Sequence, residues 1–350
     1  MIKYIGSKRL LVPRIVELAG ALPRTHSAVD LFSGTSRVGH GLKRAGFRVA
    51  SNDLSAYAAT LARCYVQADL ADHRAEAARW VAHLNTLEGQ PGYITRTFCE
   101  QARFFRPENG ARIDAMRAEI ASAALDEELE AILLTSLIEA ADRVDSTTGV
   151  QMAFLKNWAA RAHRPIQLRV PDLLRRPRAG KSSAHQLDAR EAARTLTGDV
   201  GYLDPPYNQH KYLNNYHVWE TIVRNDQPDH YGIVCKRIEC ADHRSPFNSR
   251  RDIRDAIAEV VEQLDTRYLI VSFNDEGFIP PDELRDILSA RGQVWREEID
   301  HPRYIGAQIG IRNHRGEIVG EVSHVTNKEN LFVVLPKGAR HRPAGMRREA

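Results

Sequence analysis

The chain has 350 residues, of which 43% are hydrophobic and 27% are charged, with a formal net charge of +4 and a pI of about 8.9. This composition excludes a disordered or fibrous chain and allows one large α/β domain with an insert, or two modest domains. The mild basic excess is compatible with a polyanionic partner, and the lack of a long apolar run or signal-peptide pattern predicts a cytoplasmic protein with no membrane partner.

The first 53 residues alternate between helical and extended patterns. Residues 9–21 predict a helix with an apolar stripe, and residues 27–31 predict a buried strand. After a Gly/Ser/Thr turn, residues 36–45 predict a helix and residues 47–50 a second strand. The order strand, turn, helix, strand is typical of a βαβ unit in a parallel sheet.

The middle of the chain has a helical pattern, over residues 55–87 and 95–160, and a basic, proline-containing loop follows at 164–184. Sheet signals then resume. We expect strands at 200–203, 267–273, 294–299 and 331–335, helices at 214–225, 252–264 and 281–291, and a hairpin at 304–323 that turns at 313–316.

These elements predict an α/β fold with a doubly wound, Rossmann-like sheet that a helical insert interrupts. We expect residues 1–70 and 185–336 to form the main domain, with the insert at 71–184. The basic tail at 337–350 is expected to be disordered.

The turn after the first predicted strand has the composition of a ligand-binding loop. Gly34 allows close approach of the backbone to a ligand, with Phe32 beside it, and Asp53 at the end of the second strand can accept hydrogen bonds from ribose hydroxyls. The turn lacks GxGxxG and a Walker lysine, which argues against nicotinamide or nucleoside-triphosphate cofactors. On its own, the pattern is equally compatible with a structural turn and a solvated Asp53.

A second constellation closes the strand at 200–203 with Asp204-Pro205-Pro206-Tyr207. The prolines stiffen the chain and leave the carbonyl of Pro205 free to accept a hydrogen bond, while Asp204 offers a second acceptor and Tyr207 a flat face. Two acceptors and a stacking surface suit a planar base that carries an exocyclic amine. The alternative is a rigid turn with no chemical role.

Three segments together resemble the Dam-type (alpha-group) adenine-specific DNA methyltransferases. Lys3-Tyr4-Ile5-Gly6-Ser7-Lys8 is similar to their N-terminal KWAGGK-like motif, Asp30-Leu31-Phe32-Ser33-Gly34 to their DPFxG cofactor loop, and Asp204 to Tyr207 is identical to their catalytic motif. The resemblance extends to about residue 335. It implies a Rossmann-like methyltransferase fold, S-adenosylmethionine as cofactor, and site-specific transfer of a methyl group to the 6-amino group of a flipped adenine in double-stranded DNA.

The resemblance also implies roles for individual residues. Tyr4 and Lys8 would contact the methionine end of the cofactor, with the Lys8 ammonium near its carboxylate, Asp53 would bind the ribose, and Asp188 would lie near the cofactor's adenine. The implied catalytic residues are Asp204, Pro205 and Tyr207, and the implied cofactor-binding residues are Tyr4, Lys8, Asp30, Phe32, Gly34, Asp53, Asp188 and Asp204. Thr35-Ser36 stands where the family has its second loop glycine, so the geometry of this loop is expected to differ.

Contacts to DNA are expected from the insert, the basic loops and the segment after the catalytic motif. The candidates are Lys211, Tyr212, Asn214 and Arg176. Which arginines read bases stays open, as do a monomeric or dimeric state and a cognate restriction enzyme or an orphan role.

Several alternatives follow from the same residues. A cytosine-5 methyltransferase is rejected because it needs a cysteine after a proline, and no Pro-Cys occurs. Methylation of the cytosine amine, methylation of RNA or protein, and a non-catalytic nucleic-acid-binding module stay open. The four cysteines lack the spacing of a zinc or redox site, so no metal is expected.

Overall fold

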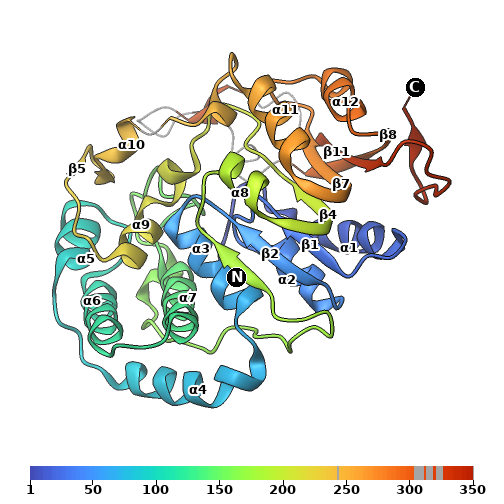
Figure 1. The fold of residues 1–350 in the computed structure, drawn as a ribbon. Helices are drawn as coiled ribbons and strands as arrows, with labels where there is room; N and C mark the ends of the chain where they lie inside the picture. The colour runs from blue at the N-terminus through green and yellow to red at the C-terminus, as the bar shows by residue number, and fades with distance from the viewer. Residues whose placement is uncertain (243, 303–310, 313–317, 321–325, 350) are drawn as a thin grey trace.

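The computed structural model describes residues 1–242, 244–302, 311–312, 318–320 and 326–349. Its centre is an eight-stranded sheet with the order β12-β8-β11-β7-β4-β1-β2-β3 (Figure 1). The bounds are β1 Ser27–Asp30, β2 Arg48–Asn52, β3 Ser183–His185, β4 Thr197–Leu203, β7 Asp265–Asn274, β8 Gln293–Pro302, β11 Thr326–Leu335 and β12 Arg347–Arg348.

Five neighbouring strands of the sheet are parallel to one another, in the order β7-β4-β1-β2-β3. β11 is antiparallel to both of its neighbours, β7 and β8. The chain leaves β1 toward β2 and β3 on one side and returns to β4 on the other side of β1. This reversal of strand order confirms the predicted doubly wound sheet and creates a switch point between β1 and β4.

Helices cover both faces of the sheet, and alternate side chains of each strand enter two separate cores. On β7, Leu269 and Val271 pack with α8 (Ala189–Thr195), α11 (Ile253–Gln263) and α12 (Pro281–Ser289). Tyr268 and Ile270 belong to the core of the opposite face. That face carries α1 (Val12–Ala21), α2 (Arg37–Arg44) and α3 (Ala56–Ala62).

A helical region gathers on one side of the molecule, away from the C-terminus (Figure 1). It contains α4 (Leu70–Thr86), α5 (Tyr93–Thr95), α6 (Pro107–Ser122) and α7 (Glu127–Val144). The carboxylate of Asp126 caps α7 by accepting from the backbone N–H groups of Glu128 and Leu129.

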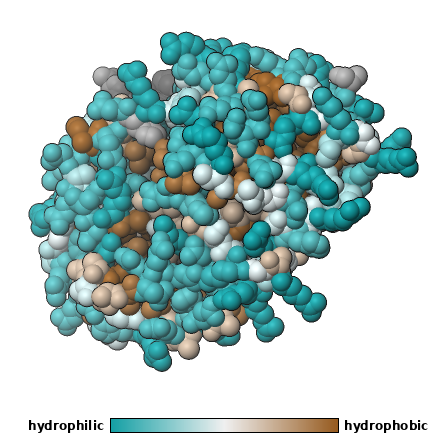
Figure 2. Space-filling view, viewed as in Figure 1, coloured by the Kyte–Doolittle hydropathy of each residue, from teal (hydrophilic) through white to brown (hydrophobic). Residues whose placement is uncertain are grey.

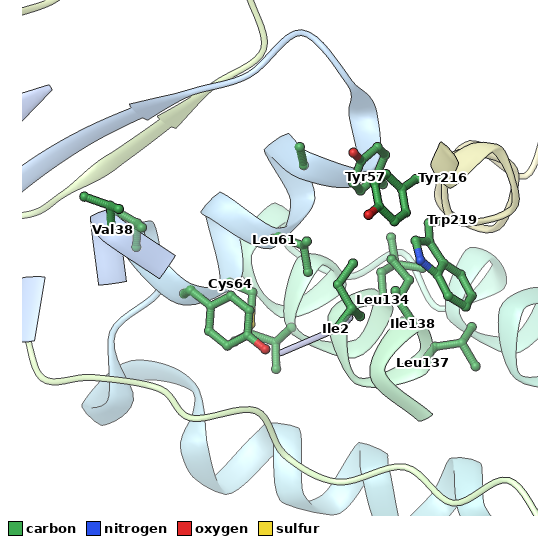
Figure 3. Packing of buried hydrophobic residues seen from close by; sticks show 14 of the residues in the cluster. Ile2, Val38, Tyr57, Leu61, Cys64, Leu134, Leu137, Ile138, Tyr216 and Trp219 are labelled. Carbon is green, nitrogen blue, oxygen red and sulfur yellow. The ribbon is translucent and has the colours of Figure 1, made fainter. Parts of the chain in front are cut away.

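The helical region shares a hydrophobic core with one face of the sheet. α7 contributes apolar side chains that pack against α3 and α9 (Tyr212–Arg224), as Figure 3 shows. The labelled members include Ile2, Leu61, Leu134, Leu137, Ile138 and Trp219. Hydrophilic side chains cover most of the face seen in Figure 2, and the apolar ones show mainly between them. The helices at 71–184 are therefore packed continuously with the strands, although they interrupt the sheet in sequence.

Some predicted elements differ from those observed. The helix expected through residue 160 ends at Val144, and the segment to residue 182 holds only the short helix η4 (Ala160–His163). Just past the helix end, the hydroxyl of Thr147 donates to the carboxylate of Asp145 at 2.5 Å. Short polar side chains that bond locally compete with helical hydrogen bonding.

The C-terminal region contains further differences. The sequence predicts disorder after residue 336, whereas β12 pairs with β8 and the backbone N–H of Glu349 donates to the carbonyl of Val294 at 2.9 Å. β9 (Ile311–Arg312) and β10 (Ile318–Gly320) pair antiparallel, while the predicted turn at 313–316 lies outside the described residues. Within the described ranges, no helix is long and apolar enough to cross a membrane.

Candidate active site

A pocket opens at the switch point, beyond the carboxyl ends of β1 and β4. Seven segments line it: the N-terminal segment, the β1–α2 turn, the end of β2, the start of α8, the turn after β4, the start of α9 and the segment 245–248. The predicted site residues among its walls are Tyr4, Lys8, Asp30, Phe32, Gly34, Asp53, Asp188, Asp204 and Tyr212. The sheet topology therefore brings together residues that are up to about 200 positions apart in sequence.

Asp53 organises the turn after β1. Its carboxylate accepts from the backbone N–H of Gly34 at 2.9 Å and from that of Ser55 at 3.0 Å. Burial nevertheless raises the pKa of Asp53 above its ordinary value. Gly34 has a φ of +50°, and a Cβ there would lie 3.2 Å from the hydroxyl of Tyr4. A side chain at position 34 would thus be strained and would crowd the pocket wall.

Several buried oxygens around the pocket lack hydrogen-bond partners. They are the Oδ1 atom of Asp30 and the hydroxyls of Ser7, Ser33 and Tyr202. The other oxygen of Asp30 accepts from the N–H of Gly39 at 2.9 Å, yet burial raises the pKa of Asp30 to about 7. Unpartnered buried polar atoms are costly, and their concentration around this pocket is typical of a site that binds a polar ligand.

Tyrosine rings hold the N-terminal segment against the pocket. Tyr4 stacks with Tyr212 at 5.4 Å between ring centroids and with Tyr216 at 4.6 Å. The backbone N–H of Ile5 donates to the hydroxyl of Tyr216 at 2.6 Å. Aromatic stacking and this hydrogen bond fix the segment that carries Lys8.

Lys8 lies between the buried carboxylate of Glu329 and the partly buried carboxylate of Asp204. Its Nζ is 3.0 Å from Asp204 and 2.7 Å from Glu329, and Glu329 also accepts from Ser272 at 2.5 Å and from Asn274 at 3.2 Å. Burial lowers the pKa of Lys8, but the two carboxylates raise it by more. The pKa of Lys8 therefore lies well above its ordinary value. Burial raises the pKa of Asp204 to about 6, even though Lys8 lowers it. The ammonium is therefore charged at neutral pH and supports an ionised Asp204.

Packing holds the turn after β4 in place. The ring of Tyr207 contacts the ring of Phe273 edge-on, with 6.2 Å between the ring centroids. The backbone carbonyl of Tyr207 accepts from the N–H of Phe278 at 2.8 Å. The side chain of Asn248 donates to the carbonyls of Asn208 and His210 at 2.7 and 3.2 Å. Asp204 and Pro206 line the pocket, whereas Pro205 and Tyr207 lie beside it in the same turn.

The remaining predicted residues lie at varying distances from this centre. Asp188 caps α8 by accepting from the N–H of Arg190 at 3.0 Å, and it also lines the pocket. Lys211 and Asn214 flank Tyr212 at the start of α9. Arg176 is placed elsewhere, because its guanidinium pairs with Asp69 at 2.7 Å and Asp72 at 2.8 Å near the start of α4.

The sequence reasoning missed Glu329 and the segment 245–248, which contributes Phe247 and Asn248 to the pocket wall. No local pattern distinguishes Glu329, which precedes an apolar strand as a surface acid often does. No group of three or more potential metal ligands occurs among the described residues.

A doubly wound sheet with a pocket at its switch point, an aspartate directly after β2 and an Asp-Pro-Pro-Tyr turn after β4 together define a Rossmann-like methyltransferase.

Comparisons with known proteins give the family. Residues 4–287 match the model of the D12 class N6 adenine-specific DNA methyltransferases, and the chain belongs to this family. It is therefore a site-specific adenine DNA methyltransferase, which needs a methyl donor and acts on DNA. This decides between the alternatives that the sequence left open, in favour of adenine over the cytosine amine and of an enzyme over a binding module.

The named relatives are type II methyltransferases and modification methylases. The chain is 30% identical over 340 residues to the type II methyltransferase M.NlaIII of Neisseria lactamica, which covers 93% of this chain and 99% of the relative. It is 30% identical over 309 residues to M.FokI of Planomicrobium okeanokoites and 28% identical over 353 residues to modification methylase StsI of Streptococcus sanguinis. The two alignments cover 83% and 95% of this chain, respectively. They cover only 47% of M.FokI and 53% of StsI, so this chain spans about half the length of each of these two relatives.

Proposed function

We propose that the switch-point pocket binds S-adenosylmethionine and that the turn after β4 presents a flipped adenine to it. The observation that carries the proposal is that Asp53 and Asp204 line the same pocket. The unpartnered oxygens of Ser7, Asp30 and Ser33 fit a ligand with an ammonium group and hydroxyls, because each can accept a hydrogen bond.

The pocket offers separate groups for each part of this ligand. Asp53 accepts from the ribose hydroxyls, and Asp188 and Phe32, which also line the pocket, hold the adenine of the cofactor. Tyr4 and Lys8 serve the methionine end. Two carboxylates already pair with the Lys8 ammonium, and a lysine has three N–H donors, so one donor is left for the carboxylate of the ligand.

S-adenosylmethionine supplies an electrophilic methyl group when bound. The side chain of Asp204 and the carbonyl of Pro205 accept the two N–H groups of the target amine, and Tyr207 stacks on the base. This orients the nitrogen lone pair out of the ring plane. Asp204 supports the positive charge that develops on the amine and can take up the proton that the amine loses. No covalent intermediate with the protein is required.

A base inside a duplex cannot reach this pocket, so the adenine is flipped out of double-stranded DNA. Lys211, Tyr212 and Asn214 lie next to the catalytic turn and are the contacts we propose for the extruded nucleotide or its phosphates. Arg176 would have to leave two carboxylates to bind DNA, which makes it a poorer candidate. From the names of the relatives we further propose a modification role beside a restriction enzyme.

The test is base-resolution detection of N6-methyladenine in DNA from cells that express the protein. The wild type should methylate adenine within one recurring sequence, and Asp204→Ala should leave the DNA unmodified. Asp199→Ala is the matched control. Asp199 lies near the start of β4, at the opposite end from Asp204, and its carboxylate accepts from the N–H groups of His26 and Ser27. Methylation that persists in Asp204→Ala would refute the role of this residue.

A further inference from the structure

Helix α9 is interrupted at Tyr216, directly beside the pocket. Tyr216 has φ −134° and ψ 26°, far from helical values, whereas the residues on either side continue the helix. Sharp kinks in helices have identifiable causes, such as proline, a π-bulge or an inserted side chain. Neither proline nor glycine occurs between Tyr212 and Arg224, so the cause lies outside the helix.

The cause is Gln151, which comes from the loop after α7. Its backbone N–H donates to the carbonyl of Asn215 at 2.9 Å, and its side-chain oxygen accepts from the N–H of Val218 at 2.8 Å. Its carbonyl is bonded to the ring of His217 at 3.1 Å. In an uninterrupted helix the N–H of Val218 would bond to the carbonyl four residues earlier. Gln151, which is only 3% exposed, therefore replaces a helical hydrogen bond with its own.

The kink divides α9 into two parts with different surroundings. The first turn carries Tyr212, which lines the pocket and stacks with Tyr4. The second part is anchored in the core by Trp219, which is 2% exposed (Figure 3). At the junction, the non-helical backbone directs the ring of Tyr216 onto Tyr4 and its hydroxyl to the N–H of Ile5. The orientation of the first turn thus depends on the bond to Gln151.

The loop that carries Gln151 links this junction to the surface. Pairing of Thr147 with Phe154 closes the loop, and Asp145 at its base pairs with Lys3 at 2.8 Å and with Arg161 at 2.7 Å. Next to Gln151, the side chain of Met152 is 43% exposed. One loop therefore contacts the N-terminal segment, α9 and solvent.

We propose that Gln151 is a positioning residue for methyl transfer: it holds α9 kinked so that Tyr212 and Tyr4 form the pocket wall against which the adenine and the donor are held. The inference rests on the proposed function of the pocket. Without the side-chain acceptor, the N–H of Val218 would bond to the carbonyl of Asn214, the helix would straighten, and the stacked rings would separate.

The test compares Gln151→Met, which keeps the size of the side chain and removes the acceptor, with Gln151→Glu, which retains an acceptor oxygen. We expect Gln151→Met to lower kcat on unmethylated genomic DNA by about 10- to 100-fold, as a misplaced group does, with KM for DNA changed less than about threefold. Gln151→Glu should recover most of this loss. With 2-aminopurine at the target position, Gln151→Met should also change the fluorescence of the bound duplex.

Asn109→Leu is the matched control. Asn109 is 5% exposed, and its side-chain oxygen accepts from the N–H of Ile166 at 2.9 Å in the helical region, away from α9. The Asn109→Leu variant should lose about as much stability as Gln151→Met and should keep the kcat of the wild type. The inference is overturned if Gln151→Met keeps kcat, if Asn109→Leu loses as much, or if neither Gln151 variant folds cooperatively, which would make the residue merely structural. An inactive wild type would instead refute the proposed function.

Discussion

The ion pair between Lys8 and Asp204 predicts how the rate of methylation depends on pH. Asp204 must be ionised to accept from the target amine, and its pKa is raised to about 6. Methylation by the wild type should therefore be slow at pH 5 and rise to a plateau above about pH 7. Lys8→Met removes the cation that favours the ionised form, so the rise should move to higher pH.

The magnitude follows from the geometry. The Nζ of Lys8 is 3.0 Å from the carboxylate of Asp204. At this distance and an effective dielectric constant of about 20, the attraction between the two charges is about 5 kcal/mol, which corresponds to at most about 4 pKa units. Part of this is lost because Lys8 is shared with Glu329 and because water can enter the space left by the lysine. We therefore expect an upward shift of about 1 to 2 units in the pH of half-maximal rate.

The assay is single-turnover methylation of unmethylated DNA between about pH 5 and 9 at saturating methyl donor, so that weaker donor binding does not contribute. Lys8→Arg keeps the charge and is the control, and it should shift the profile much less. A wild-type rate that is independent of pH, or an unshifted profile for Lys8→Met, would refute the reasoning.

Three further predictions concern the donor side of the pocket. Asp53→Ala should abolish measurable S-adenosylmethionine binding in calorimetry and leave DNA binding unchanged, and equal loss of both would count against a specific role. Gly34→Ala places a Cβ at positive φ 3.2 Å from the hydroxyl of Tyr4, so Kd for the donor should rise by about tenfold or more, and an unchanged Kd would contradict the close approach. Burial disfavours the ionised form of Asp30 and raises its pKa from 3.8 to about 7. The free energy of unfolding should therefore fall as the pH rises between these two values. Asp30→Asn should then be more stable than the wild type at pH 8 by up to about 4 kcal/mol in thermal unfolding and show no such gain at pH 4, whereas a pH-independent difference would contradict this.

The parts of the site that could be predicted from the sequence are those that short segments encode. The turn around Gly34, Asp53 at a strand end and the turn at Asp204 each lie within a few residues of an apolar strand. The carboxyl ends of parallel strands meet at one edge, so the strand order alone brings these segments to one pocket. Their individual roles in binding and catalysis stay predictions.

Glu329 and Gln151 could not be predicted, because their surroundings come from distant segments. Glu329 is buried only because β11 inserts between β7 and β8, and it lies beyond residue 287, where the match to the family model ends. Gln151 is one polar residue in a loop, and its role depends on the carbonyl and N–H groups of a helix more than 60 positions later.

Arginine content alone does not define a DNA-binding surface. Arg176 lies in a basic stretch of the chain, and the structure pairs it with two carboxylates. Charge along the sequence does not reveal which cations already have a partner in the fold.

The pair between Lys8 and Glu329 has a consequence for the synthesis of the enzyme. The two residues are separated by 321 positions, so their contact forms only after almost the whole chain has left the ribosome. Contacts between such distant residues form slowly, because a long loop must close first. A nascent chain that ends before β11 contains each of the three recognisable motifs and still lacks one of the two carboxylates that pair with Lys8. The surroundings of Lys8 are thus completed only when β11 joins the sheet, and a chain truncated before β11 should fail to methylate DNA although it contains all three motifs.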